Sequence, residues 1–379
     1  MWGGKTAPHR KTRHEELMKT RLLALAAVLT VVLSACTAPT HPDTQPKTAS
    51  DTTATQQSPA QSKTKLPDPH TLTGLTVVPD IADPTPLEGS FKQTLPTTIR
   101  DFEGNSVTVT DTSRILAMDL TGTLSRTVIA LGFGDKLVGR TVSSTEKQLA
   151  DLPVVTENGH TLNTEAILAL KPTLIVVDRS IGPPEALDQL RASGIPVVLV
   201  DPARGIDKNS ALIKSVANAL GTPEAGTALA DRVEKETKAA LAQIKQWIPA
   251  QPLEASFLYV RGTGGVFFIL GGNEGATALI EALGAKDLAT AQGLKGVTPA
   301  NAEALVALNP EIIFTMSSGL DSTNGLKGLL ARPGVAETRA GQKQRVVAIP
   351  DGLSLSFGPQ TAETLLAVAR ATYGIDEDK

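Results

Sequence analysis

Residues 163–177 (NTEAILALKPTLIVV) and residues 301–315 (NAEALVALNPEIIFT) are near repeats of one another, 138 positions apart. Each stretch predicts the same pieces in the same order: a helix that begins after an Asn, a proline that ends it, and a short apolar strand. An Ala-Leu-Gly run precedes each stretch, at 130–132 and at 282–284. Because a repeat of this length exceeds any solenoid period, it predicts two similar α/β lobes.

The sequence around the first repeat alternates strands and helices. Residues 97–110 predict a hairpin of two short strands around a turn at 103–105. Further strands are expected at 114–118, 137–139, 174–178 and 197–201, and helices at 122–131, 164–170 and 184–193. Such alternation predicts a parallel sheet with helices on both faces. We therefore expect an α/β fold of two Rossmann-like lobes, residues 95–205 and 250–379.

The segment between the lobes, residues 206–249, predicts two helices. The first covers 207–220 and ends at Gly221, and the second begins after Pro223 and runs to 247, with Pro249 just beyond. The second helix would be about 36 Å long, which is the diameter of a small domain. We expect one long α-helix to join the lobes, with a ligand cleft between them.

The N-terminus reads as an export signal. Basic residues precede an uncharged apolar run at 22–33, which is too short to span a bilayer of roughly 30 Å. The only Cys of the chain, Cys36, follows in a Leu-Ser-Ala-Cys sequence that resembles the bacterial lipobox. We expect residues 1–35 to be a lipoprotein signal peptide, Cys36 to be acylated, and residues 36–94 to form a flexible polar leash.

The amino-acid composition excludes several classes of protein. One Cys among 379 residues excludes a disulfide scaffold and multi-cysteine metal sites. A net charge of −3 argues against electrostatic binding of nucleic acid. No Ser/His/Asp order, nucleophile elbow or paired-carboxylate motif is visible, and the folded part holds one histidine, so we expect no enzyme.

That histidine, His160, lies in a polar loop just before the first repeat, and Tyr259 lies in an apolar strand that opens the second lobe. Haem iron accepts His and Tyr as axial ligands, and phenolate suits Fe(III). Arg261 is two positions after Tyr259, so both side chains project from the same face of the strand. A guanidinium beside a phenol favours the phenolate.

The lipobox, leash, paired lobes and long helix resemble the helix-backbone class of ABC-importer substrate-binding proteins, which serves haem, cobalamin and iron–siderophores. The His160, Tyr259 and Arg261 arrangement is similar to that of corynebacterial haemin-binding lipoproteins in this class. The resemblance implies that His160 and Tyr259 are the axial ligands of haem iron and that Arg261 stabilises the phenolate. It also implies that Glu165 and Glu303, one in each repeat, dock onto the permease, although both also suit the first turn of a helix.

The implied function is capture of ferric haem, as haem b, and its delivery to an ABC permease and its ATPase for iron acquisition. Surface haem-binding proteins are the expected donors, and the lipid on Cys36 would anchor the protein to the outer face of the cytoplasmic membrane. The alternative is the same fold binding a ferric siderophore or cobalamin. A siderophore calls for several Arg or Lys residues in the cleft, and cobalamin leaves Tyr259 and Arg261 without a task.

Overall fold

The computed structural model describes residues 66–376 except 158, 273 and 274, and all of them belong to one compact unit, Lys63–Lys379. The expected signal peptide and Cys36 lie outside the described residues. Within residues 66–376, no helix is both long enough and apolar enough to cross a bilayer.

The first half of the described chain contains a parallel sheet covered on both faces, as predicted. Its strands are in the order β4 (Ile115–Met118), β7 (Leu174–Val177), β8 (Val197–Leu199). Alternate residues of each strand enter two different cores, as the two-residue period of a strand requires. One core includes α1 (Thr123–Val128) and the other includes α2 (Thr164–Ala169) and α3 (Pro184–Ala192).

Short elements complete this half. The predicted hairpin at 97–110 is confirmed as β2 (Thr97–Arg100) and β3 (Ser106–Val109). The expected strand at 137–139 is reduced to a single bridge between Ile115 and Leu137. The remaining pieces are η2 (Ile129–Phe133), η3 (Gly134–Lys136), η4 (Lys147–Leu149), β5 (Thr156–Glu157) and β6 (Thr161–Leu162).

The second half is built on a seven-stranded mixed sheet in the order β1-β14-β13-β9-β10-β12, with β11 paired to β9. Its strands are β1 (Leu75–Val77), β9 (Glu254–Arg261), β10 (Val266–Leu270), β11 (Lys286–Asp287), β12 (Val297–Pro299), β13 (Ile312–Met316) and β14 (Val346–Ile349). Strands β10 and β12 are antiparallel to their neighbours, so this sheet is mixed, unlike the parallel sheet of the first half. The four residues between β9 and β10 are too few for a parallel crossover.

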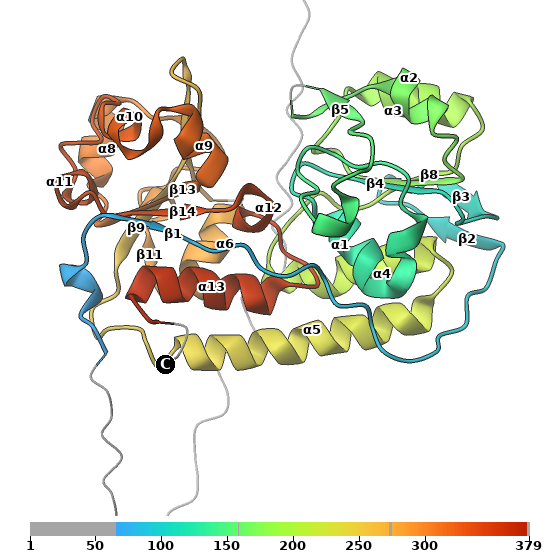
Figure 1. The fold of residues 1–379 in the computed structure, drawn as a ribbon, viewed down its shortest axis with the longest axis horizontal. Helices are drawn as coiled ribbons and strands as arrows, with labels where there is room; N and C mark the ends of the chain where they lie inside the picture. The colour runs from blue at the N-terminus through green and yellow to red at the C-terminus, as the bar shows by residue number, and fades with distance from the viewer. Residues whose placement is uncertain (1–65, 158, 273–274, 377–379) are drawn as a thin grey trace, which may run out of the picture. The chain divides into compact units, whose positions relative to one another are not determined.

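Helices cover both faces of this second sheet (Figure 1). On one face lie α6 (Gly275–Ala282) and α13 (Thr361–Tyr373). On the other lie α7 (Leu288–Ala291), α8 (Ala302–Leu308), α9 (Ser317–Ser322), α10 (Gly325–Leu330) and α11 (Arg339–Lys343). The short helix α12 (Asp351–Ser354) follows β14 directly.

The repeated sequence forms the repeated structure that it predicts. The side chains of Asn163 and Asn301 each accept a hydrogen bond from the backbone N–H three residues later, at 2.9 and 2.8 Å. These N-caps begin α2 and α8, and a buried strand follows each helix. Even the left-handed residues that end the two helices correspond, Lys171 and Asn309, with φ of 46° and 47°.

Between the two sheets, η5 (Ile206–Lys208), α4 (Asn209–Ala219) and the 22-residue α5 (Pro223–Ile244) follow one another. Helix α5 contacts both α4 and α13, which are labelled above it in Figure 1. Near its N-terminus Leu229 and Val233 enter the core of the first sheet, and at its end Ile244 enters a core of the second. The expected helix end at 247 is three residues too late.

The segment before residue 95 differs from the expectation of a leash. From residue 66 the described chain includes η1 (Pro69–Thr71) and β1, which pairs in parallel with β14. Val78 is buried in the second core, and Leu87 and Phe91 pack against the first. These apolar side chains offset the entropy cost of ordering the segment. The leash boundary at 94 is therefore wrong, and the rest of the expected leash lies outside the described residues.

Candidate functional site

Tyr259 lies near the carboxyl end of β9, a strand that is flanked by β13 and β10 within the sheet. Its neighbours Leu258 and Val260 are buried in one core, whereas Tyr259 is half-buried and packs on the opposite face. Arg261 projects on the same side, as the strand period predicts. Its guanidinium carbon lies 5.3 Å from the centre of the Tyr259 ring, which is cation–π distance.

The Arg261 guanidinium has three further contacts. Nη1 donates to Ser318 Oγ at 3.0 Å, and Nη2 contacts Met316 Sδ at 3.6 Å and forms an ion pair with Asp351. Burial lowers the pKa of Arg261, but Asp351 and, to a smaller extent, the Tyr259 phenol outweigh it, so that pKa is raised above its usual value. Sequence reasoning missed Asp351, although its place directly after the β14–Pro350 stretch puts it at the same sheet edge.

His160 lies on the β5–β6 hairpin of the first half, and its side chain is exposed. Gly159, with φ of 86°, supplies the left-handed residue that the hairpin turn requires. The backbone carbonyl of His160 accepts a hydrogen bond from Gly182 N–H at 2.9 Å. Among the described residues, nothing forms a hydrogen bond or ion pair with its ring, which leaves both ring nitrogens available.

A buried charged cluster lies at the carboxyl ends of the strands of the first sheet. Arg204 Nη2 donates to Asp119 Oδ2 at 3.2 Å and also pairs with Asp178. Both carboxylates are fully buried, so two negative charges share one guanidinium. Burial raises the pKa of Asp178 to about 6, the charge of Asp119 adds to the rise, and Arg204 opposes it.

The cluster fixes the loop that supports His160. Asp178 accepts hydrogen bonds from the backbone and side chain of Ser180, and Ser180 Oγ accepts one from Leu120 N–H at 2.9 Å. Two residues further along the chain, Gly182 N–H donates a hydrogen bond to the His160 carbonyl. Sequence reasoning missed this cluster too, because its members come from three separate loops, each after a strand.

Two apolar side chains near the hairpin face solvent. Leu120 is 45% exposed and Val142 is 50% exposed. Val142 N–H donates to Thr156 Oγ1 at 3.0 Å, which ties it to the first strand of the His160 hairpin. An exposed Leu or Val alone means little, but the backbones of these two are bonded to Ser180 and Thr156, in the segments that carry and hold the His160 hairpin.

His160 and Tyr259 come from different sheets, and within the described residues no hydrogen bond or ring contact joins them. A side-chain hydrogen bond joins the two halves of the described chain. Arg126 Nη1 of α1 donates to Ser356 Oγ, just after α12, at 3.1 Å. The same guanidinium pairs with the buried Glu146 at 2.5 Å. The segment that follows α12 therefore contacts the first half.

Glu165 and Glu303 occupy equivalent places, in the first turns of α2 and α8. Both are exposed, and neither carboxylate has a hydrogen-bond or ion-pair partner in the part of the chain that the structure describes. A negative charge in the first turn of a helix is favoured by the helix dipole.

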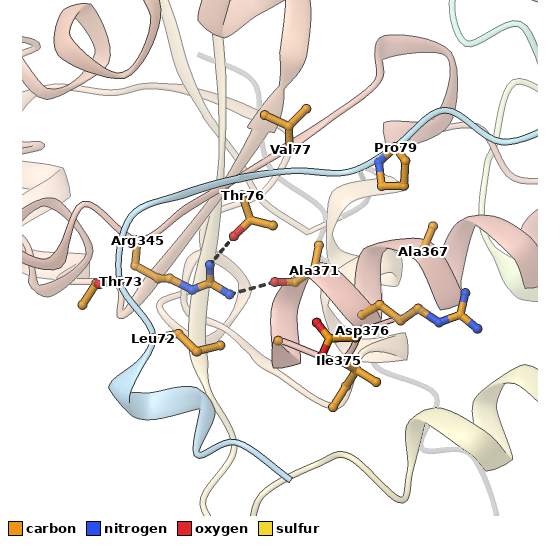
Figure 2. A pocket seen from close by; sticks show the side chains of 12 residues that line it. Leu72, Thr73, Thr76, Val77, Pro79, Arg345, Ala367, Ala371, Ile375 and Asp376 are labelled. Atoms are coloured by element: carbon orange, nitrogen blue, oxygen red, sulfur yellow. Dashed lines mark hydrogen bonds between the residues drawn. The ribbon is translucent and has the colours of Figure 1, made fainter. Parts of the chain in front are cut away.

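Two large hollows lie away from these residues. One of about 640 Å³ lies between β1 and the end of α13 (Figure 2). There Arg345 donates to Thr76 Oγ1 and to the Ala371 carbonyl, both at 2.8 Å, and burial lowers its pKa to about 10. Another of about 600 Å³ lies beside β3 and residues 194–197. No group of three or more His, Cys, Asp or Glu residues in the described chain is placed to hold a metal ion.

The chain matches a family model described as periplasmic binding protein over residues 120–353. Among solved structures, heme binding protein HmuT is 51% identical with a TM-score of 0.79, and the match covers 81% of this chain and 99% of that chain. HmuT variants in which a histidine, a tyrosine or an arginine is replaced by alanine match with the same TM-score.

More distant relatives bind related ligands. The periplasmic heme-binding protein RhuT from Roseiflexus sp. RS-1 is 34% identical with a TM-score of 0.65, over 70% of this chain and 99% of that one. A vitamin B12-binding protein of Yersinia pestis is 38% identical over 95 residues, 25% of this chain. The match spans about a third, 34%, of the length of that curated relative.

Proposed function

The chain belongs to the periplasmic binding protein family, and from that membership we propose that it is the substrate-binding protein of an ABC importer for haem. Proteins of this family bind and deliver a substrate and are not enzymes. The observation that carries the proposal is the half-buried Tyr259 with Arg261 against its ring, in a chain that is 51% identical to a heme-binding protein.

The spacing of three residues supports the ligand assignment. In the HmuT variants the replaced tyrosine and arginine are two positions apart, and the replaced histidine precedes that tyrosine by 99 positions. Tyr259 and Arg261 are likewise two positions apart, and His160 precedes Tyr259 by 99 positions. We infer that His160 and Tyr259 are the axial ligands of the haem iron and that Arg261 assists Tyr259.

The chemistry of these groups fits ferric haem b as the transported ligand. Fe(III) favours an anionic oxygen donor, and a phenolate supplies it. Arg261 adds positive charge beside the phenol and thereby favours the phenolate. The imidazole of His160 completes the axial pair. Its ring has no partner among the described residues, so binding iron breaks no hydrogen bond that the structure records.

We further propose that α5 joins two lobes and that haem lies between them. Helix α5 contributes side chains to a core of each sheet, which supports a connecting role. Haem faces are apolar, and binding pockets for such ligands are mostly apolar. Leu120 and Val142 have exposed side chains, and their backbone N–H groups are bonded to Ser180 and Thr156 near the His160 hairpin, so they are candidates in the first lobe to cover one face.

Delivery calls for an ABC permease and its ATPase, and we propose that Glu165 and Glu303 dock onto the permease. Their equivalent positions, exposure and lack of partners within the described residues support this role. We also propose that surface haem-binding proteins supply the haem and that acylated Cys36 anchors the protein to the outer face of the membrane. Cys36 lies outside the described residues.

A haemin titration followed by absorbance tests the proposed function. We expect one saturable Soret transition per chain. Tyr259→Ala should weaken binding more than His160→Ala, because it removes the anionic ligand that balances ferric charge. Tyr373→Phe is the matched control, since the Tyr373 hydroxyl is buried and donates to the Leu283 carbonyl, within a structural core. Absence of saturable binding would refute the function, and equal losses from the two ligand variants would refute the ranking.

Cobalamin is the second candidate, because the Yersinia pestis relative is a vitamin B12-binding protein. That match covers only 25% of this chain, and cobalamin gives Tyr259 and Arg261 no role. A parallel titration with cobalamin separates the two: we expect no saturable binding, and cobalamin binding that competes with haemin would favour this second candidate.

A further inference from the structure

Asp351 connects three elements at the edge of the second sheet. Its Oδ1 accepts a hydrogen bond from Ser318 N–H, at the start of α9, at 3.0 Å. Its Oδ2 accepts one from Arg261 Nη2, at the end of β9. Arg261 Nη1 closes the ring by donating to Ser318 Oγ at 3.0 Å. Both oxygens of Asp351 are therefore engaged, and two guanidinium nitrogens of Arg261 have hydrogen-bond partners.

Asp351 is the group that holds Arg261 in this orientation. The two side chains are only 23% and 33% exposed, so their ion pair is less screened than a surface pair. The other groups on the guanidinium are neutral: Ser318, Met316 and the ring of Tyr259. Without Asp351, no charged partner within residues 66–376, as far as the structure describes them, would keep the guanidinium over the phenol ring.

Asp351 is itself held by its surroundings. It is the first residue of α12, directly after Pro350 at the end of β14. A Cβ added at Gly352, the next residue, would lie close to Thr145 Oγ1 and 2.8 Å from Arg126 Nη2 of the first half, so those side chains would have to move. Ser356, two residues beyond the helix, accepts a hydrogen bond from Arg126 at 3.1 Å. The carboxylate is therefore presented to Arg261 from a packed segment.

We propose that Asp351 is a positioning residue for haem binding: its carboxylate fixes Arg261 against the Tyr259 ring, so that the positive charge lies beside the phenolate that binds iron. This inference rests on the proposed function. Because Asp351 acts through Arg261, its removal should matter only while Arg261 is present.

A double-mutant cycle tests this dependence. Haemin affinity is measured for the protein, Asp351→Asn, Arg261→Ala and the double variant. Because Asp351→Asn removes one charged hydrogen bond, we expect it to weaken haemin binding about tenfold. In the double variant, Asp351→Asn should cause no loss beyond that of Arg261→Ala alone. Unchanged or tighter binding by Asp351→Asn would overturn the proposal. So would an equal loss in both backgrounds, because a merely structural role does not depend on Arg261.

Asp188→Asn is the matched control. It removes another aspartate–arginine pair, with Arg191 on α3 at 2.9 Å, in the first half of the chain. We expect its haemin affinity to equal that of the unmodified protein.

A measurement without haem separates this inference from the proposed function. Arginine side-chain NMR signals of the ligand-free protein are recorded, and the Arg261 signal is identified by its loss in Arg261→Ala. In the unmodified protein, rotation of the Arg261 guanidinium should be restricted. In Asp351→Asn the guanidinium should rotate fast, so that its N–H signals are averaged. If the protein binds no haem, the proposed function fails, and this spectrum still decides whether Asp351 positions Arg261. An unchanged Arg261 signal would refute the positioning role.

Discussion

Replacing Asp178 by Asn should change how the stability of the protein depends on pH. Asp178 is fully buried, and it shares the single guanidinium of Arg204 with Asp119. Burial, together with the charge of Asp119, raises the pKa of Asp178 from 3.8 to about 6. The folded protein therefore binds this proton more tightly than the unfolded chain does, and the proton stabilises the fold.

The sign and the size of the effect follow from this difference in pKa. The stabilisation is fully present below pH 3.8 and is lost as the pH rises through about 6. Over the full range it amounts to about 3 kcal/mol, at 1.36 kcal/mol per pKa unit. Between about pH 4.5 and about pH 7.5, where the fold is easier to study, the expected change is about 2 kcal/mol.

Urea denaturation of the protein and of Asp178→Asn across this pH range measures the change. Asn cannot titrate, so the free energy of unfolding of the protein minus that of the variant should fall by about 2 kcal/mol as the pH rises. A constant cost of placing an Asn amide beside Arg204 cancels in this comparison. Equal m-values would show that both proteins unfold from the same compact state. A difference that stays flat, or that increases with pH, would refute the reasoning.

Two further predictions concern the repeated helices. Glu165→Ala combined with Glu303→Ala should leave haemin affinity unchanged, because both carboxylates are exposed and unpaired among the described residues, but should abolish haem uptake by cells. Uptake at the normal rate would contradict permease docking. Asn301→Ala removes the 2.8 Å cap of α8 and should lower the free energy of unfolding by about 1 kcal/mol, measured in urea at neutral pH. Stability equal to that of the unmodified protein would show that the cap contributes nothing.

Local chemistry explains which parts of the fold the sequence predicts. An Asn cap, a short amphipathic helix, a proline and an apolar strand are all defined within about 15 residues, so the two repeats and their helices were predictable. Pairing between distant segments carries no such local signal. The parallel pairing of β1 with β14 joins Leu75 to Val346, and nothing near Leu75 indicates that partner. The antiparallel β10, which follows a glycine-rich turn after Arg261, was not predicted either.

The same distinction applies to the site. The two-residue period of a strand places Tyr259 and Arg261 on one face, and the ring contact at 5.3 Å confirms it. Asp351 lies 90 residues from Arg261 in the sequence, and only the fold brings their side chains together. Its one advance signal is its place after the apolar stretch at 346–349, because the carboxyl ends of parallel strands meet at a common edge.

The backbone elements that carry His160 and Tyr259 differ in length and in strand pairing. Tyr259 is part of an eight-residue strand with a paired neighbour on each side, whereas His160 lies on a hairpin whose strands have two residues each. In the proposed complex, the protein would therefore hold the two axial ligands by different means. Tyr259 would be held by strand pairing on both sides, and His160 by a turn whose carbonyl is bonded to Gly182. A variant that disturbs residues 178–182 would then act on the His160 ligand and leave the Tyr259 ligand in place.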